Sequence, residues 1–163
     1  MTSIRPAEHR DLDSIVAFEI EIARISFGDE AVLDPEMHSR RVVKALEDPG
    51  EGTFVAEPDA GSAPTSGPVG SAPTGGPVGW LWVSARKNFL TGEEYGFLRS
   101  LAVAETHHGT PLGEELLAAG VEWARSHGAR EVTGKVHVDN VAMRTAYRAA
   151  GFSAQHLTMR LEL

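Results

Sequence analysis

Residues 98–113 constrain the fold most strongly, because a short apolar strand there runs into a glycine-containing turn that opens an amphipathic helix. The first turn of a helix has backbone N–H groups without partners and carries the positive end of the helix dipole. An anion can bind there without a basic side chain, and Gly109 and Gly113 let the backbone approach it closely. The pattern predicts an anion-binding turn, although such strand–turn–helix segments are equally common without a ligand.

The length and composition predict a single α/β domain over residues 1–163. No apolar run is long enough for a membrane span and no signal-peptide pattern is present, so we expect a cytoplasmic protein that does not bind membranes. The chain has no cysteine, which excludes disulfides and cysteine nucleophiles, and its histidines lack zinc-site spacing, so we expect no metal. The net charge of −8 argues against nucleic-acid binding and suits a cationic substrate such as an amine.

Apolar periodicity predicts an ordered series of strands and helices. Strands are expected at residues 3–7, 53–56, 78–83, 94–103 and 132–138, with a closing strand at 157–163. Helices are expected at residues 11–26, 35–46, 111–126 and 141–150. Two early helices, a hairpin and then alternating strands and helices imply a mixed central sheet flanked by helices. Trp80 and Trp82 share a face of their strand and are expected in the core.

A tandem duplication interrupts the hairpin. Residues 61–69 recur almost unchanged as residues 70–78 and consist mainly of Gly, Ser, Pro, Ala and Thr. This composition buries too little apolar surface to offset the entropy lost on ordering, so we expect a flexible loop at about residues 58–78. An expanded loop without function is favoured over a binding lid.

A second segment accompanies the anion-binding turn. Asn140 follows the 132–138 strand, Tyr147 lies seven residues later, and Gly151 and Phe152 come four and five residues after Tyr147. Together with residues 101–103 and 108–113, this arrangement resembles the GNAT superfamily of acetyl-CoA-dependent N-acetyltransferases. The resemblance covers about residues 4–163 and implies the GNAT-like acyl-CoA N-acyltransferase fold, an α/β (α+β) architecture with a central twisted mixed sheet.

The resemblance implies that acetyl-CoA is the cosubstrate, with its pyrophosphate at the turn and its pantetheine arm along the edge of the 94–103 strand. The implied cofactor-binding residues are Leu101, Ala102, Val103, His108, Gly109, Thr110, Pro111, Leu112, Gly113 and Asn140. The family's Arg/Gln-x-x-Gly-x-Gly/Ala pattern has His108 at its first position and Pro111 at its middle glycine. Proline supplies no N–H, and His108 adds charge only when protonated, which predicts tighter binding in mild acid. Helix capping is the alternative role for Asn140.

The resemblance also implies direct attack of an amine on the thioester, without a covalent enzyme intermediate. Tyr147 would donate a proton to the leaving thiolate, since a phenol stays protonated at neutral pH. From the residues alone, a half-buried packing tyrosine is the alternative. A base acting on the amine through a water is placed at Glu94, with Glu93, Glu19 and Glu21 as further candidates.

The acceptor is expected to be a small molecule or a peptide with an amine. Arg99 could bind a carboxylate of that substrate, although an exposed or ion-paired arginine is the more common finding. The resemblance also allows a homodimer, with the closing strand or the hairpin as its sheet edge. The alternative function is a GNAT-like module that binds CoA or a partner without catalysis, which the departures at His108 and Pro111 keep open.

Overall fold

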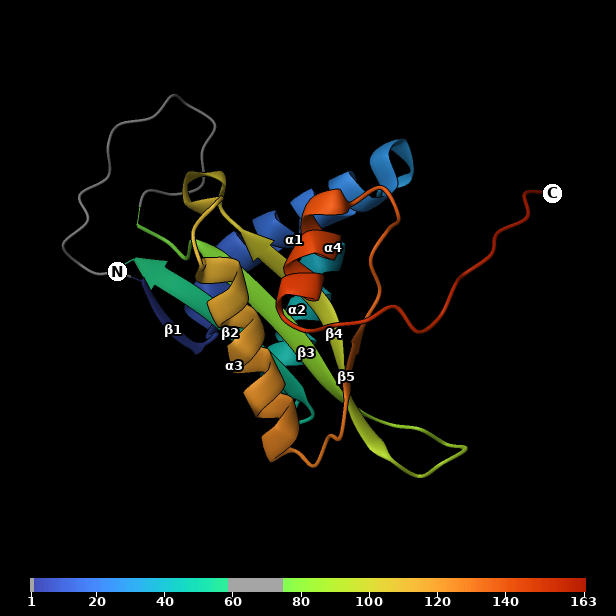
Figure 1. The fold of residues 1–163 in the computed structure, drawn as a ribbon. Helices are drawn as coiled ribbons and strands as arrows, with labels where there is room; N and C mark the ends of the chain where they lie inside the picture. The colour runs from blue at the N-terminus through green and yellow to red at the C-terminus, as the bar shows by residue number, and fades with distance from the viewer. Residues whose placement is uncertain (1, 59–74) are drawn as a thin grey trace.

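The computed structural model describes residues 2–58 and 75–163, and in that part of the chain a five-stranded mixed sheet has helices on both faces (Figure 1). The strands are β1 (Thr2–Pro6), β2 (Glu51–Pro58), β3 (Gly79–Lys87), β4 (Glu94–Val103) and β5 (Val132–Gly134). The α-helices are α1 (Leu12–Phe27), α2 (Pro35–Glu47), α3 (Leu112–Ser126) and α4 (Val141–Ala149). Short 3-10 turns are η1 (His9–Asp11), η2 (Gly28–Glu30) and η3 (Glu105–His107). The expected α/β fold is confirmed.

The strands lie side by side in chain order. Strands β1 to β4 are antiparallel neighbours, and β5 is parallel to β4 because α3 carries the chain back across the sheet. Pairing between β4 and β5 ends at Leu98 and Gly134, whereas β4 continues to Val103. The sheet therefore opens into a fork between the second half of β4 and the chain that follows β5 (Figure 1).

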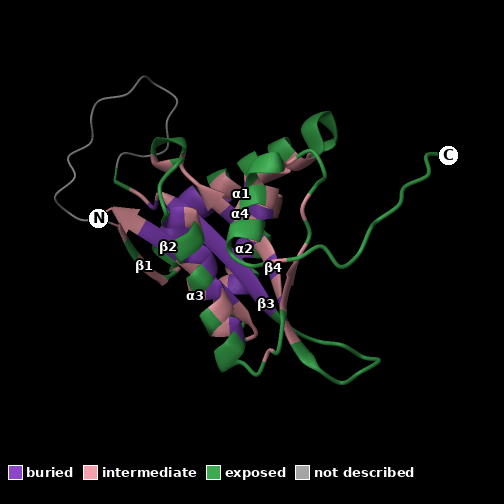
Figure 2. Ribbon diagram, viewed as in Figure 1, coloured by how far each residue is buried: buried purple, intermediate pink, exposed green. Residues whose placement is uncertain are grey.

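Each face of the sheet has its own buried cluster. Helix α3 covers a cluster that includes Leu81, Leu98 and Leu116, and Gly120 lets the helix approach, because a Cβ there would lie 2.5 Å from Leu81 Cδ2. Helices α1 and α2 cover the opposite face, where the buried side chains are Ile15, Val42, Ala45, Val55, Trp80 and Trp82. Helix α4 lies on the α3 side, beside the fork (Figure 1). Burial is concentrated in the central strands and the inner sides of the helices (Figure 2).

The helix predictions are confirmed to within one residue at each end, and the strand expected at residues 94–103 has the same bounds as β4. Local chemistry explains the helix starts. At the start of α2, Asp34 precedes Pro35 and its side chain accepts a hydrogen bond from the Glu36 N–H at 3.1 Å. At the start of α4, Asn140 Oδ1 accepts a hydrogen bond from the Met143 N–H at 3.0 Å. Both tryptophans of β3 are in the core, as expected.

Two strand predictions are wrong. The strand expected at residues 132–138 ends at Gly134, because the chain there leaves β4 to form the fork. Residues 157–163 form no strand and their apolar side chains are exposed (Figure 2). Alternation alone does not make a strand, which also needs a partner with free backbone N–H and C=O groups.

The loop expected at about residues 58–78 falls largely in residues 59–74, outside the described residues. Its ends are anchored in the sheet, since the Val78 N–H donates to the Ala56 carbonyl at 2.7 Å. Within the described ranges, no helix combines the length and the apolar character that crossing a bilayer demands.

Candidate active site

The turn between β4 and α3 presents free backbone donors. Among the described residues, the N–H groups of Gly109, Gly113 and Glu114 have no hydrogen-bond acceptor, whereas the Thr110 N–H donates to the His107 carbonyl at 3.3 Å. Gly109 has φ of 79°, a conformation that favours glycine, and a Cβ built there would meet nothing within 4 Å. The start of α3 therefore combines open space with unpaired amides and the positive end of a helix dipole.

The two departures from the family pattern have defined positions in this turn. Pro111 is the N-cap residue of α3 and offers no N–H there. His108 Nε2 lies 2.9 Å from the Val103 carbonyl, so this ring holds the turn against the end of β4. Glu114 and Glu115 occupy the first helical turn and reduce its positive potential.

A β-bulge marks the point where the fork begins. Trp82 lies opposite Ser100, whereas the next residue of β3, Val83, lies opposite Leu98, so Arg99 is the extra residue on β4. Arg99 directly follows Leu98, the last residue of β4 that pairs with β5. Bulges leave backbone groups outside the ladder and redirect side chains. The bulge was not visible in the sequence, because it depends on the register between two strands.

Tyr147 reaches the fork from α4. A Cβ at Gly134 would lie 2.8 Å from its hydroxyl oxygen, and its ring stacks on Phe152 with 4.9 Å between ring centroids. Burial raises the pKa of Tyr147 to about 12. The phenol therefore keeps its proton throughout the neutral range.

Asn140 has the capping role. Its Oδ1 accepts from the Met143 N–H at 3.0 Å at the start of α4. It also lines a hollow of about 350 Å³ between the end of α1 and the segment before α4, together with Ile25, His137, Asp139, Val141 and Ala142. This hollow lies beside the helix that carries Tyr147.

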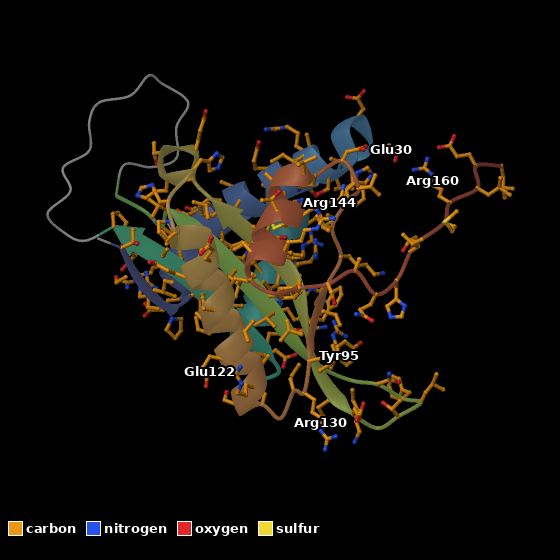
Figure 3. The ribbon with its side chains drawn as sticks, in the orientation of Figure 1. Glu30, Tyr95, Glu122, Arg130, Arg144 and Arg160 are labelled. Carbon is orange, nitrogen blue, oxygen red and sulfur yellow. The ribbon has the colours of Figure 1, made fainter. Side chains whose placement is uncertain are left out.

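The carboxylates proposed as bases occupy different faces of the sheet. Glu94 lies at the start of β4 on the α3 side, where its Oε2 is 2.6 Å from the position of a Cβ on Gly128. The next residue, Tyr95, lies at the base of the β3–β4 hairpin, well away from Arg144 on α4 (Figure 3). The structure therefore does not bring Glu94 together with Tyr147. The position along β4 explains this placement, because Glu94 is the first residue of the strand and lies five residues before the bulge at Arg99.

Glu19 lies on the opposite face. Its side chain projects from α1, is only 5% exposed, and accepts from the Trp80 indole N–H at 2.8 Å. Glu21 is exposed and pairs with Arg24 at 2.9 Å, and Glu93 pairs at the surface with Arg130 at 3.3 Å. Of the four candidates, Glu19 is the carboxylate held in the interior beside the sheet.

Sequence reasoning missed Glu51. Its Oε2 accepts from the Trp82 indole N–H at 2.6 Å and from the Ser84 hydroxyl. The guanidinium of Arg99 lies over the same Trp82 ring, 4.6 Å from its centroid. A tryptophan expected in the core gave no sign of these polar neighbours, which come from β2 and β4.

A family model and several known proteins match parts of this chain. The model of the family described as the acetyltransferase (GNAT) family matches residues 22–152. The chain is 36% identical over 73 residues to an aminoglycoside N(6')-acetyltransferase type 1 of Stenotrophomonas maltophilia, covering 43% of this chain and 48% of that protein. It is also 36% identical over 59 residues to an uncharacterized N-acetyltransferase, YobR, of Bacillus subtilis strain 168, covering 36% of this chain and 24% of that protein. The chain thus matches about half or less of the length of these relatives.

Solved structures share the fold. The aminoglycoside acetyltransferase AAC(6')-Iy, in complex with a bisubstrate analog of CoA and acetylneamine, has a TM-score of 0.75 at 16% identity, with coverage of 100% of this chain and 98% of that chain. A putative acetyl transferase from Pyrococcus furiosus has a TM-score of 0.75 at 19% identity, with both chains covered completely. At these identities the likeness establishes the fold.

Proposed function

We propose that this chain, which belongs to the acetyltransferase (GNAT) family, transfers an acetyl group from acetyl-CoA to a primary amine. The observation that carries this proposal is the free edge of β4 in the fork, which connects Tyr147 with the turn before α3. The free edge of β4 runs from the bulge at Arg99 to the open amides of the α3 turn, and the Tyr147 hydroxyl lies against Gly134 at the start of that edge. This arrangement would place an anion site and a proton donor at opposite ends of one strand edge.

In this proposal the turn holds the pyrophosphate of acetyl-CoA. The amides of Gly109, Gly113 and Glu114 would donate to its oxygens, as expected of a helix N-terminus. The backbone of Leu101, Ala102 and Val103 would pair with the amide groups of the pantetheine arm, because β5 does not cover this edge. The thioester would then lie near the bulge, beside Tyr147.

The reaction is a direct attack of the amine nitrogen on the thioester carbonyl. A backbone N–H of the bulge would donate to the carbonyl oxygen as negative charge develops there. The carbon–sulfur bond then breaks, and Tyr147 donates its proton to the leaving thiolate. Because the pKa of Tyr147 is about 12, the phenolate regains a proton from water at once.

The amine must also lose a proton. We assign this step to Glu19 acting through a water, since Glu19 lies on the α1 side of the sheet and its carboxylate is fixed by the Trp80 indole. Glu94 lies five residues before the bulge at Arg99, at the far end of β4, which argues against the same role for Glu94.

The acceptor is proposed to be a small molecule with a primary amine. The support is the similarity to aminoglycoside acetyltransferases, together with the net charge of −8, which favours the approach of a cation. A module that binds CoA without catalysis is the second candidate, favoured by the missing N–H at Pro111 and the acidic first turn of α3.

The test has two stages. The melting temperature is measured with acetyl-CoA and with adenosine, since a ligand at about 100 times its Kd adds roughly 2.7 kcal/mol of stability. Release of CoA is then followed with a thiol reagent over a panel of amines, and the absence of cysteine from the chain removes the background reaction. A shift specific to acetyl-CoA with amine-dependent CoA release supports the enzyme. A shift without release from any amine favours the binding module, and no shift at millimolar acetyl-CoA contradicts both.

A further inference from the structure

Two arginines flank one buried tryptophan on the face covered by α1 and α2. The Arg99 guanidinium lies 4.6 Å from the centroid of the Trp82 ring, and the Arg41 guanidinium, from α2, lies 5.7 Å from it. Trp82 is only 4% exposed, whereas Arg99 is half-buried and Arg41 is exposed. The Trp82 ring therefore lies near two guanidinium groups, one from β4 and one from α2.

Neither guanidinium is held in an ion pair by a carboxylate of the described residues, although Glu51 and Glu19 act on Arg99 from a longer distance. Across residues 2–58 and 75–163, Arg41 and Arg99 form no ion pair within 4.0 Å and no hydrogen bond, in contrast to Arg40, which pairs with Glu36. The carboxylates nearby already accept from tryptophans, Glu51 from the Trp82 indole at 2.6 Å and Glu19 from the Trp80 indole at 2.8 Å. Burial lowers the pKa of Arg99, Glu51 and Glu19 oppose this shift and Arg86 and Arg41 add to it, and the arginine stays charged at neutral pH.

Arg99 lies close to the proposed position of the thioester and far from the proposed pyrophosphate site. Arg99 follows Leu98, whose partner on β5 is Gly134, and the Tyr147 hydroxyl lies against Gly134. The end of β4 at Val103 is four residues further on, or about 13 Å at roughly 3.3 Å per residue. The turn at α3 begins only beyond that point.

We infer that Arg99, assisted by Arg41, binds the carboxylate of an acceptor that carries an amine and a carboxylate in the same small molecule, an amino acid or a short peptide. This inference rests on the proposed acetyl transfer and names the substrate class. A guanidinium presents paired N–H donors that match the two oxygens of a carboxylate. Two adjacent unpaired cations repel a polycationic acceptor such as an aminoglycoside, so the specificity differs from that of the aminoglycoside acetyltransferases it resembles.

The substrate test uses matched pairs of acceptors. Free L-amino acids are compared with their C-terminal amides, dipeptides with dipeptide amides, and both with kanamycin, by thiol release at saturating acetyl-CoA. We expect kcat/KM to be at least about tenfold higher for a free carboxylate than for the matched amide, the ratio that corresponds to one charged hydrogen bond. The amino acid and dipeptide arms show whether the carboxylate belongs to the residue that is acetylated or to the next one.

Variants then assign the effect to these arginines. Arg99→Gln should raise KM for the carboxylate acceptor about tenfold or more, change the amide little, and leave KM for acetyl-CoA unchanged. Arg41→Gln should have a smaller effect in the same direction. Arg40→Gln is the matched control for α2, because Arg40 pairs with Glu36 and is exposed, and it should change neither constant.

The outcomes separate this inference from the proposed function. Turnover confined to amides or kanamycin, or equal turnover of acids and amides, would overturn the carboxylate site and leave acetyl transfer standing. A rise in KM for acetyl-CoA in Arg99→Gln would assign the arginine to the cofactor and overturn the inference. No turnover with any member of the panel would overturn both. Retention of the wild-type melting temperature in each variant excludes a folding defect as the cause of any change.

Discussion

The hydroxyl of Tyr147 lies so close to Gly134 that a Cβ at Gly134 would stand 2.8 Å from the phenol oxygen. Gly134 is the last residue of β5 that pairs with β4, so the contact sets the hydroxyl at the opening of the fork. The packing on Phe152, at 4.9 Å between ring centroids, fixes the ring from another side. The glycine thus provides the space for the phenol, and the position of the hydroxyl depends on both Gly134 and Phe152.

Removing this hydroxyl should affect turnover and leave cofactor binding intact. Tyr147→Phe keeps the ring and its stacking, and we expect kcat to fall about 10²- to 10⁴-fold, the usual contribution of a general acid. Stopped-time CoA release measures kcat, and the melting-temperature shift with acetyl-CoA measures binding. An equal loss of both would assign Tyr147 to binding. Since the pKa of Tyr147 is about 12, wild-type kcat should show no decline from its ionisation up to pH 10.

Filling the space at Gly134 should displace the hydroxyl. We expect Gly134→Ala to lower kcat, because the new methyl group would push the phenol out of the fork. Thr133→Ala, at the preceding position of β5, is the matched control and should retain activity. The double variant Gly134→Ala/Tyr147→Phe should be no slower than Tyr147→Phe alone. A further loss in the double variant would show that Gly134 acts independently of Tyr147.

If Glu19 acts as the base, its replacement should change the pH dependence of kcat/KM. Glu19→Gln can still accept from the Trp80 indole, so the fold is preserved while the proton acceptor is lost. We expect kcat/KM to fall at pH 7 by about 10²-fold or more and the deficit to shrink at high pH, where the free amine no longer needs a base. Glu21→Gln, on the exposed side of α1, is the control. A deficit that stays constant with pH would contradict the assignment.

The proline at the start of α3 should weaken cofactor binding. Pro111→Gly restores a backbone N–H at the N-cap, and one hydrogen bond to a charged group is worth about 1.5 to 3 kcal/mol. We expect Kd for acetyl-CoA, measured by calorimetry, to fall by about tenfold. Pro35→Gly at the start of α2 controls for the general effect of replacing a proline. An unchanged Kd would mean that the anion does not use this amide.

The N-terminal strand is held by a charge cluster that gives a pH signature. Arg5 donates to both oxygens of Asp11 at 2.8 Å, and Asp11 is only 3% exposed. Burial alone would raise the pKa of Asp11, but the hydrogen bonds from Arg5 prevail and hold it below its usual value, and Arg5 also lowers the pKa of Glu57. Both folded-state pKa values are depressed, so the stabilisation is fully present above pH 4.5. It declines as the pH falls below the ordinary values of 3.8 and 4.5, and it is lost once the pH has fallen through the lower folded-state values.

Breaking this cluster should destabilise the fold most at neutral pH. We expect Arg5→Met to lower the free energy of unfolding by about 3 kcal/mol at pH 7, because it strands a buried carboxylate. Urea denaturation at pH 7 and at pH 3.5 measures the difference. It should shrink at the lower pH, because Asp11 binds a proton there more readily in the unfolded chain than in the folded wild-type protein. Arg24→Met, which breaks an exposed pair with Glu21, should cost less than about 1 kcal/mol. If the loss of unfolding free energy in Arg5→Met were the same at both pH values, it would come from lost packing and not from the charge cluster.

The positions of Glu94 and Glu19 in the fold differ from what their sequence positions indicate. Sequence position favours Glu94 as the base, because its strand faces the proposed thioester, yet Glu94 lies five residues before the bulge at Arg99. Glu19 was a weaker candidate on sequence, and the fold buries it against Trp80. Sequence position narrows the choice to a strand or helix, but the face presented to the site follows from sheet pairing.

The sequence by itself determined the helices and the long strand β4, and it offered capping of α4 as one of two roles for Asn140. These features depend on residues within a few positions of one another, so local periodicity and capping chemistry are sufficient. Only the tertiary structure decided the bulge at Arg99, the early end of β5 and the placement of Tyr147 against Gly134. Each depends on register between segments far apart in the chain, and a shift of one residue in a strand reverses the face that a side chain reaches.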